Sequence, residues 1–244
     1  MPHVPPLNLD AVNQQLENQS PRQILEWVWK TFGKRAALQS SMQKTASTLS
    51  HLIYSLDMKI DVLFVDTGVH FPETLQTRDL LAQKYNLNVI TLHPARTMEE
   101  QRQDYGRDLY MADGDYQICC ELRKEAPFLG WVRGRYDAVI GGLMRSEGGK
   151  RSRIRIIGED DRMDAYKIYP LANWDEEKVD EYNERHEVPV HPLHFLSFPS
   201  IGCSTCTTPV APGENPRAGR WRHIREAQEI PVTHLYCGIN REDK

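Results

Sequence analysis

The regular exchange of strand-like and helix-like segments is the feature of this sequence that most constrains its fold. DVLFV (61–65) is a continuous apolar run, which is typical of a strand buried on both faces of a parallel sheet. Three further segments are predicted to be strands: AALQS (36–40), NVITL (88–92) and YDAVIGG (136–142). Helical segments over 45–56 and 72–86 separate the first three strands. This alternation predicts an α/β fold with an open, doubly wound and mostly parallel sheet.

The chain is predicted to divide into three parts. They are a polar N-terminal lead-in (1–19), an α/β domain expected to bind a nucleotide (20–200) and a loop-rich C-terminal segment (201–244). The lead-in carries one short amphipathic helix around 9–16. Ser20 and Pro21 then start the next helix, because serine is a good N-cap and proline suits the first turn. Another short amphipathic helix, DEEKVDEYNERH, lies at 175–186.

The composition is that of a globular protein with a substantial core. Of the 244 residues, 40% are hydrophobic and 26% are charged. No apolar run approaches the roughly 20 residues that span a bilayer, and MPHVPPLNLD does not resemble a secretory signal. The expected location is therefore the cytoplasm, with no membrane partner and with a homo-oligomer left open. The net charge of −4 gives no overall attraction to nucleic acid, so any anion-binding site must be local.

Polar segments follow the predicted strands at their carboxyl ends. They are QSSMQK (39–44), DTGVHFPE (66–73), HPAR (93–96) and GGLMRSEGGKRSR (141–153). In open α/β sheets ligands bind at this edge, and three of the four segments have the Ser, Gly, Lys or Arg content that suits an anionic, nucleotide-like ligand. Gly68 allows the backbone to turn close to such a ligand. Asp66 is placed to accept a hydrogen bond from a hydroxyl or an amine.

The five cysteines form two tight pairs and one single residue. Cys119 and Cys120 are adjacent, and Cys203 and Cys206 form a C-x-x-C motif, whereas Cys237 stands alone. Adjacent cysteines do not easily pair with each other, because a disulfide requires a separation that a trans dipeptide strains. In a cytoplasmic protein, clustered cysteines more often indicate metal binding or catalysis.

The C-x-x-C motif by itself is consistent with half of a zinc site, a redox dithiol or half of an iron–sulfur site. A redox dithiol normally opens a helix after a strand, whereas CSTC follows FPSIG, far from a helix start. The two pairs together supply four thiolates for one metal centre, which either zinc or a cubane iron–sulfur cluster can use. Four unmetallated core thiols are the remaining alternative.

Several ordered motifs resemble those of a known family. They are DTGVHFPET, CCELRKEAP, YPLANW, VPVHPLH, PSIGCSTCTTPVAPGE, RAGRW and CGI, and they extend over most of the chain. The sequence is similar to the assimilatory adenylyl-sulfate reductases, which are relatives of the phosphoadenylyl-sulfate reductases. Both belong to the adenine nucleotide α-hydrolase-like fold.

Three places depart from the usual pattern of that family. The first loop, QSSMQKTAS, has no glycine where the family usually carries a stretch such as SFSGAED. The loop GGLMRSEGGKRS keeps Arg145 and Arg151 but has Met144 and Glu147. Asn240 follows CGI at the position where the family usually has histidine.

The resemblance implies the reduction of adenylyl sulfate to sulfite and AMP in sulfate assimilation. A thiol donor such as thioredoxin would supply the electrons, and Cys237 would be the nucleophile that carries an S-sulfonate. Phosphoadenylyl sulfate is the alternative substrate. A tRNA-thiolating or nucleotide-activating enzyme of the same fold is more remote, because that chemistry needs an SGGxDS-type loop in place of QSSMQK.

The resemblance also implies which residues form the sites. Cys119, Cys120, Cys203 and Cys206 would ligate a 4Fe–4S cluster, with the positive charges of Arg123 and Lys124 beside it. The residues predicted to bind the substrate are Ser40, Ser41, Lys44, Asp66, Gly68, Arg145, Arg151, Arg217 and Arg220. Guanidinium groups suit the two anionic groups of a sulfonucleotide because they bind such oxygens in a bidentate manner.

Overall fold

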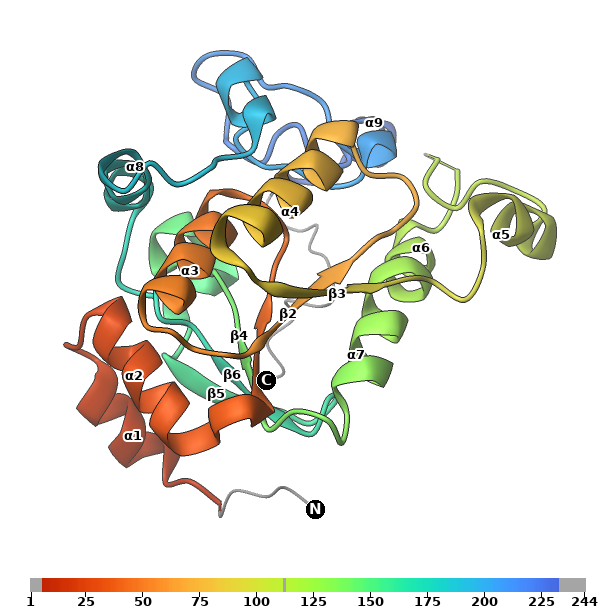
Figure 1. Ribbon diagram of the computed structural model, residues 1–244. Helices are drawn as coiled ribbons and strands as arrows, with labels where there is room; N and C mark the ends of the chain where they lie inside the picture. The colour runs from red at the N-terminus through yellow and green to blue at the C-terminus, as the bar shows by residue number, and fades with distance from the viewer. Residues whose placement is uncertain (1–5, 112, 233–244) are drawn as a thin grey trace.

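The computed structural model describes residues 6–111 and 113–232, and its centre is a six-stranded sheet (Figure 1). The strands are β1 (Ala36–Gln39), β2 (Asp61–Val65), β3 (Asn88–Leu92), β4 (Ala138–Ile140), β5 (Ile157–Asp160) and β6 (Ala165–Ile168), in the order β3-β2-β1-β4-β6-β5. All neighbours are parallel except β5 and β6. The prediction of a mostly parallel α/β sheet is confirmed. The hairpin of β5 and β6 was not predicted.

Nine α-helices lie within the described residues. They are α1 (Leu9–Leu16), α2 (Pro21–Phe32), α3 (Lys44–Ser55), α4 (Pro72–Tyr85), α5 (Met98–Tyr105), α6 (Tyr116–Cys120), α7 (Ala126–Val132), α8 (Glu176–Arg185) and α9 (Arg222–Gln228). The predicted helices over 9–16, 45–56, 72–86 and 175–186 are present. The helix that begins after Ser20 has a full capping box with Gln23. The division of the chain at 19/20 and 200/201 stays a prediction.

Helices cover both faces of the sheet, as a doubly wound fold requires. Ala36 and Leu38 of β1 belong to the core that also holds residues of α2 and α3. Ala37, between them, belongs to a second core with Phe128 of α7. Successive strand residues point to opposite faces, so one short apolar strand contributes to both cores.

The lead-in packs against the far end of the sheet. The side chain of Asn13 in α1 brackets Ile157 of β5: its Nδ2 donates to the Ile157 carbonyl at 2.8 Å, and its Oδ1 accepts from the Ile157 N–H at 3.1 Å. Glu17 binds Arg145 at 2.5 Å. The Asn13 bonds cover the backbone groups of Ile157 at the β5 edge, and the Glu17–Arg145 pair connects the end of α1 to the loop after β4.

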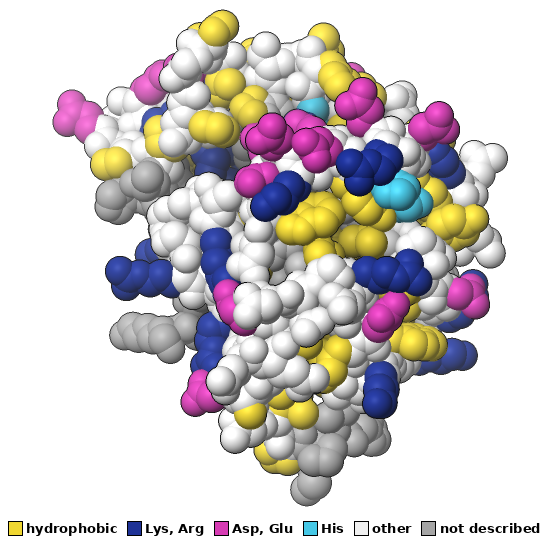
Figure 2. Space-filling model, turned by 90° about the vertical axis from the view of Figure 1, so that its left-hand side faces the viewer, with side chains coloured by type: hydrophobic (Ala, Val, Ile, Leu, Met, Phe, Trp, Pro, Cys, Tyr) yellow, Lys and Arg dark blue, Asp and Glu magenta, His cyan; other side chains and the backbone are white. Residues whose placement is uncertain are grey.

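Acidic and basic side chains are interspersed on the face shown in Figure 2. This mixture agrees with a small net charge of −4. Within residues 6–111 and 113–232, the structure has no helix with the length and apolar character needed to cross a bilayer.

Candidate functional site

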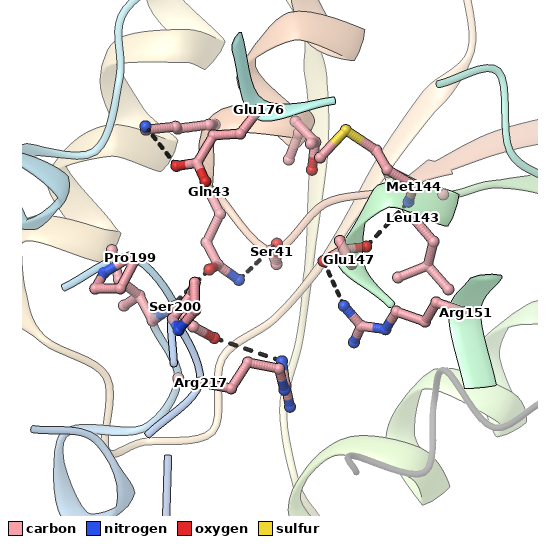
Figure 3. A pocket seen from close by; sticks show the side chains of 18 of the residues that line it. Ser41, Gln43, Leu143, Met144, Glu147, Arg151, Glu176, Pro199, Ser200 and Arg217 are labelled. Atoms are coloured by element: carbon pink, nitrogen blue, oxygen red, sulfur yellow. Dashed lines mark hydrogen bonds and ion pairs between the residues drawn. The ribbon is translucent and has the colours of Figure 1, made fainter. Parts of the chain in front are cut away.

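A cavity of about 850 Å³ lies where the strand order reverses, at the carboxyl ends of β1, β2 and β4. Ligands of doubly wound sheets bind at this switch point, and the volume is that of a small-molecule pocket. The cavity is lined by strand ends and the loops after them, and by a later loop: 39–41, 63–65, 141–144 and 199–202. Figure 3 shows Ser41, Leu143, Met144, Pro199 and Ser200 from these walls around the opening.

Basic side chains from several segments line this large cavity. They are Lys44, Lys124, Arg151, Arg217 and Arg220. Lys44 Nζ lies 3.0 Å from Glu176 and 2.9 Å from Asp180, both in α8. Burial lowers the pKa of Lys44, but the bonds to these carboxylates outweigh it and raise the pKa above its usual value. Arg151 pairs with Glu147, and Figure 3 shows Arg151 and Arg217 extending toward each other from opposite walls.

Arg217 and Arg220 converge on one serine. The Nη1 atoms of Arg217 and Arg220 lie 3.5 Å and 3.3 Å from Ser200 Oγ. Arg220 is only 6% exposed, lies over the Trp221 ring at 4.5 Å, and donates to the Ile201 carbonyl at 3.1 Å. Its Nε is buried and has no hydrogen-bond partner among the described residues.

Gly202 makes room for that guanidinium. A Cβ atom at this position would lie 2.4 Å from Arg220 Nη2, closer than non-bonded atoms approach. The glycine that precedes Cys203 is therefore required for Arg220 to lie where it does. Ile201 and Gly202 line the large cavity, and the chain then continues directly into the C-x-x-C motif.

Four cysteine side chains line a second, smaller cavity beside the first. Cys120, Cys203 and Cys206 are buried, Cys119 is half-buried, and all four are free thiols. Lys124 lines both cavities. The two cysteine pairs, more than 80 residues apart in sequence, are therefore brought together next to the ligand-sized cavity.

A π-helical turn positions the first cysteine pair. Residues Glu121–Glu125 form this turn between α6, which ends at Cys120, and α7. Pro127 has no N–H to donate to the carbonyl four residues earlier, and its ring crowds that carbonyl, so a regular α-helix is disfavoured there. The wider turn leaves Cys119, Cys120 and Lys124 lining the same cavity.

The surroundings of the thiols suit anionic sulfur. Thr67 Oγ1 lies 3.4 Å from Cys203 Sγ, and Gln101 Nε2 lies 3.6 Å from Cys119 Sγ. Arg123 is buried against this cavity, donates to the Thr67 carbonyl at 2.6 Å, and has its pKa lowered by burial. Hydrogen bonds and positive charge around metal-bound sulfur are common in such centres.

As bare thiols, Cys119 and Cys206 would be weak nucleophiles. Burial raises the pKa of Cys119, and it raises the pKa of Cys206 to about 11. A bound metal reverses this effect, because a coordinating thiol loses its proton. Across the described part of the chain, no three His, Cys, Asp or Glu side chains are arranged to hold a single metal ion. In a cubane each cysteine binds a separate iron, so the four-thiol donor set fits a cluster.

Comparisons with known proteins agree with this arrangement. Residues 35–209 match the phosphoadenosine phosphosulfate reductase domain. The chain belongs to this reductase family. An adenosine 5'-phosphosulfate reductase of Streptomyces coelicolor is 39% identical over 87% of this chain and 88% of its own length.

Two solved structures also resemble the fold. The phosphoadenylyl-sulfate reductase of Candida auris, in a phosphate complex, has a TM-score of 0.74 at 25% identity, over 84% of this chain and 100% of that chain. The U34-tRNA thiolase NcsA of Methanococcus maripaludis, solved with its [4Fe-4S] cluster, has a TM-score of 0.51 at 12% identity, over 95% and 84% of the two chains. The second likeness concerns the fold alone.

Within this reductase fold, six of the nine predicted substrate residues line the large cavity: Ser40, Ser41, Lys44, Arg151, Arg217 and Arg220. The described residues that line it do not include Asp66, Gly68 or Arg145. Asp66 accepts from the Gly68 N–H at 2.9 Å, and Gly68 lies against Arg123. Arg145 instead binds Glu17, Asn173 and the Ile154 carbonyl. The substrate roles of all nine residues stay predictions.

Cys237 lies outside the described residues, as does Asn240. The described chain ends at Val232, which lines the large cavity. The role of Cys237 as nucleophile stays a prediction.

Residues that the sequence did not single out complete the site. Ser200 joins the two arginines, while Thr67 and Gln101 contact the cysteine sulfurs. Thr67 lies inside the DTG motif and Ser200 inside PSIG. Both residues therefore belong to motifs that carry the family resemblance. Gln101 lies in α5, a helix that was not predicted, and its contact with Cys119 spans 18 residues.

His191 is buried beside α4, and its half-buried neighbour His194 lines the large cavity. His191 is 0% exposed; its Nδ1 accepts from the Leu193 N–H at 3.3 Å, so its Nε2 carries the proton and donates to Thr74 Oγ1 at 2.9 Å. Burial lowers the pKa of His191 to about 4. The neighbouring His194 lines the cavity, and burial lowers its pKa to about 3.

We expect His191 to make the fold sensitive to acid. Between pH 6.5 and about 4 the unfolded chain binds a proton that the folded chain rejects, so stability falls as the pH falls, by about 1.4 kcal/mol per unit. In His191→Gln, the loss of melting temperature between pH 7 and pH 4.5 should be smaller than in the wild type. His93→Gln, at an exposed position, is the matched control. Equal slopes in all three proteins would contradict the assignment.

Proposed function

We propose that this chain is an adenylyl-sulfate reductase, an oxidoreductase that converts adenylyl sulfate to sulfite and AMP. One observation carries the proposal: a ligand-sized cavity whose lining includes five basic side chains shares one of them, Lys124, with a cavity lined by four thiols. Three relatives named adenosine 5'-phosphosulfate reductase, 35%, 38% and 39% identical, support the choice of substrate.

Three arginines in the cavity walls suit the phosphosulfate part of the substrate. Arg217 and Arg220 approach it from the Ser200 side, and Arg151 approaches from the loop after β4. Guanidinium forks bind phosphate and sulfate oxygens in a bidentate manner. The apolar residues 63–65 at the end of β2 and the glycines at 141–142 offer an uncharged wall against which the nucleoside can pack.

Cys119, Cys120, Cys203 and Cys206 would hold the 4Fe–4S cluster in this proposal. When bound, the group supplies a fixed charge distribution next to the substrate and keeps the four sulfurs deprotonated. Lys124, which lines both cavities, is placed to orient a substrate anion against that charge.

Cys237 is the proposed nucleophile. The other four cysteines are occupied as ligands in this proposal, and burial raises the pKa of the Cys119 and Cys206 thiols, so those two are poor nucleophiles as free thiols. Cys237 is five residues beyond Val232, which lines the cavity. Five residues span at most about 17 Å, so the nucleophile lies within chain length of the substrate.

The reaction balances as a thiol–sulfonate exchange. The Cys237 thiolate attacks the sulfate sulfur, and the bond from that sulfur to the AMP phosphate oxygen breaks, so AMP leaves with the electron pair. A thiolate of a dithiol donor such as thioredoxin then attacks Cys237 Sγ, and sulfite departs with the electrons of the S–S bond. The donor's second thiol resolves the mixed disulfide, and the donor is left oxidised by two electrons.

A direct assay tests the function. Reduced thioredoxin and either adenylyl sulfate or phosphoadenylyl sulfate are supplied to anaerobically purified protein, and sulfite and the nucleotide product are measured. We expect a higher kcat/KM with adenylyl sulfate. A preference for the 3′-phosphorylated substrate would replace the proposal with the phosphoadenylyl-sulfate alternative, and no sulfite from either compound would refute it.

Replacing Arg220 should weaken substrate binding. A charged hydrogen bond contributes about 1.5–3 kcal/mol, so Arg220→Ala should raise KM for adenylyl sulfate at least about tenfold. Arg220→Lys should recover only part of this loss, because an ammonium group cannot form the fork. Arg222→Ala removes a nearby surface arginine that binds Glu214 and serves as the control. Wild-type KM and kcat in Arg220→Ala would exclude this residue from the site.

A further inference from the structure

The loop after β4 places a carboxylate in the wall of the large cavity. Residues 141–144, 146–149 and Arg151 line the cavity. Of the described lining residues between 141 and 149, only Glu147 is charged. Met144 and Glu147 are also the two positions at which this loop departs from the usual family pattern. This stretch of the wall therefore has an apolar side chain and a negative charge that are particular to this chain.

The carboxylate of Glu147 is held at both oxygens. Its Oε2 accepts from the Met144 N–H at 3.0 Å, and its Oε1 accepts from Nη1 of Arg151. The Glu147 side chain is 30% exposed and that of Arg151 is 13% exposed. Figure 3 shows both on the wall that faces Ser200 and Arg217 across the cavity. A backbone donor and a half-buried guanidinium thus fix the place of this negative charge.

The neighbouring cations are bound by carboxylates as well. Arg151 binds Glu147, and Arg145 of the same loop binds Glu17 of α1 at 2.5 Å and 3.1 Å. Lys44, which also lines the cavity, binds two carboxylates of α8. A second phosphate group on this side of the cavity would therefore meet a carboxylate beside each of these three cations.

The direction of the nucleotide places its ribose beside this carboxylate. In the proposed function the sulfate end lies near Lys124 and the thiols, and the nucleoside packs against 63–65 and 141–142. Residues 143–147 connect that nucleoside wall to Arg151, which approaches the phosphosulfate. The ribose joins the base to the phosphosulfate, so it passes along this stretch. A carboxylate there accepts a hydrogen bond from a ribose hydroxyl, because its oxygens have lone pairs beyond the two bonds already made.

We propose that Glu147 is a specificity-determining residue, which accepts nucleotides with a free 3′-hydroxyl and rejects those with a 3′-phosphate. The inference rests on the proposed function, from which the direction of the nucleotide is taken. A site built to hydrogen-bond a hydroxyl discriminates strongly, because its polar groups are left mispaired when that hydroxyl is replaced. Here the replacement is an anion, so repulsion from the carboxylate adds to the lost hydrogen bond.

Calorimetric titration of the full-length protein with AMP and with adenosine 3′,5′-bisphosphate tests this selection without turnover. Wild type should bind AMP more tightly. Glu147→Gln removes the charge and keeps the shape, so its Kd for the bisphosphate should fall by about tenfold or more, because like charges a few ångströms apart near a protein surface repel by at least this much. Its Kd for AMP should change far less. An unchanged ratio of the two constants, or an equal gain for both nucleotides, would overturn the proposal.

Two further variants separate the charge of Glu147 from its effect on the loop. Glu147→Asp keeps the charge, so it should keep the wild-type preference for AMP; a relaxed preference would assign the effect to loop geometry and contradict the proposal. Glu177→Gln removes a carboxylate from another part of the cavity lining and should leave the ratio unchanged. A relaxation as large as that of Glu147→Gln would show that the total charge of the cavity selects the nucleotide. The sulfite assay reports on the proposed function separately, since nucleotide binding does not depend on reduction.

Discussion

Cys237→Ser should abolish sulfite formation while its iron content stays that of the wild type. The thiolate is the attacking species, and a serine hydroxyl neither ionises near neutral pH nor forms an S-sulfonate. Loss of a catalytic nucleophile costs several orders of magnitude, so we expect a decrease in kcat of at least about 10³-fold. Sulfite release with reduced thioredoxin measures it.

The covalent intermediate provides the sharper version of this test. Wild type mixed with adenylyl sulfate, without reductant, should gain one sulfonate by intact mass, and peptide mapping should place it on Cys237. Cys237→Ser should gain none. Sulfonate on Cys119, Cys120, Cys203 or Cys206, or turnover by the serine variant, would contradict the proposed chemistry.

The parallel part of the sheet could be predicted because its strands carry strong local signals. DVLFV is apolar throughout, as a strand covered on both faces must be, and Pro72 starts the helix that follows it. The order of the strands at the switch point then follows from the rules of doubly wound sheets. That geometry explains why the polar segments after β1 and β4 both line the cavity.

The hairpin of β5 and β6 could not be predicted in the same way. β5 is IGED, with glycine and two acids, and its β-propensity is low. Its place is fixed by tertiary contacts: Asn13 brackets Ile157, and Asp160 binds Lys167 of β6 at 2.6 Å. Neither contact has a signature in the sequence.

Long-range pairing also decided which predicted residues line the cavity. Arg145 and Arg151 lie six residues apart in one loop, yet only Arg151 lines the cavity, because Glu17 of the lead-in binds Arg145 128 residues away in sequence. Lys44 is held by two carboxylates of α8. Motif spacing identifies the loop, whereas the partner that each side chain finds depends on the fold.

The cluster prediction has the second-largest expected effect. Anaerobically purified protein should be brown with about four irons per chain, as a Cys₄ cubane requires. Alanine at any one of the four paired cysteines should remove most of the iron and the activity with it. Metal analysis and the visible spectrum measure the first effect, and the sulfite assay measures the second. Stoichiometric zinc without iron would favour the zinc alternative.

Removal of the iron should also destabilise the C-terminal part of the described chain. The segment 199–221 has little regular structure, only a short 3₁₀ turn and an isolated bridge between Thr207 and Arg220. Its core is Cys120, Cys203, Cys206, Trp221 and Ile224, so three of the five buried side chains are proposed ligands. The free energy of binding a structural metal centre is largely folding free energy. Here the bound cluster would hold the segment 199–221 against α6, because its proposed ligands come from both.

Limited proteolysis separates this structural effect from catalysis. Cys203→Ala should be cleaved within 199–232 much faster than wild type, whereas the α/β core remains resistant. Cys237→Ser, which loses the nucleophile but keeps all four ligands, should be cleaved in that segment at the wild-type rate. If Cys203→Ala keeps both its iron and its protease resistance, the four thiols do not form a metal centre, and packing alone holds the segment.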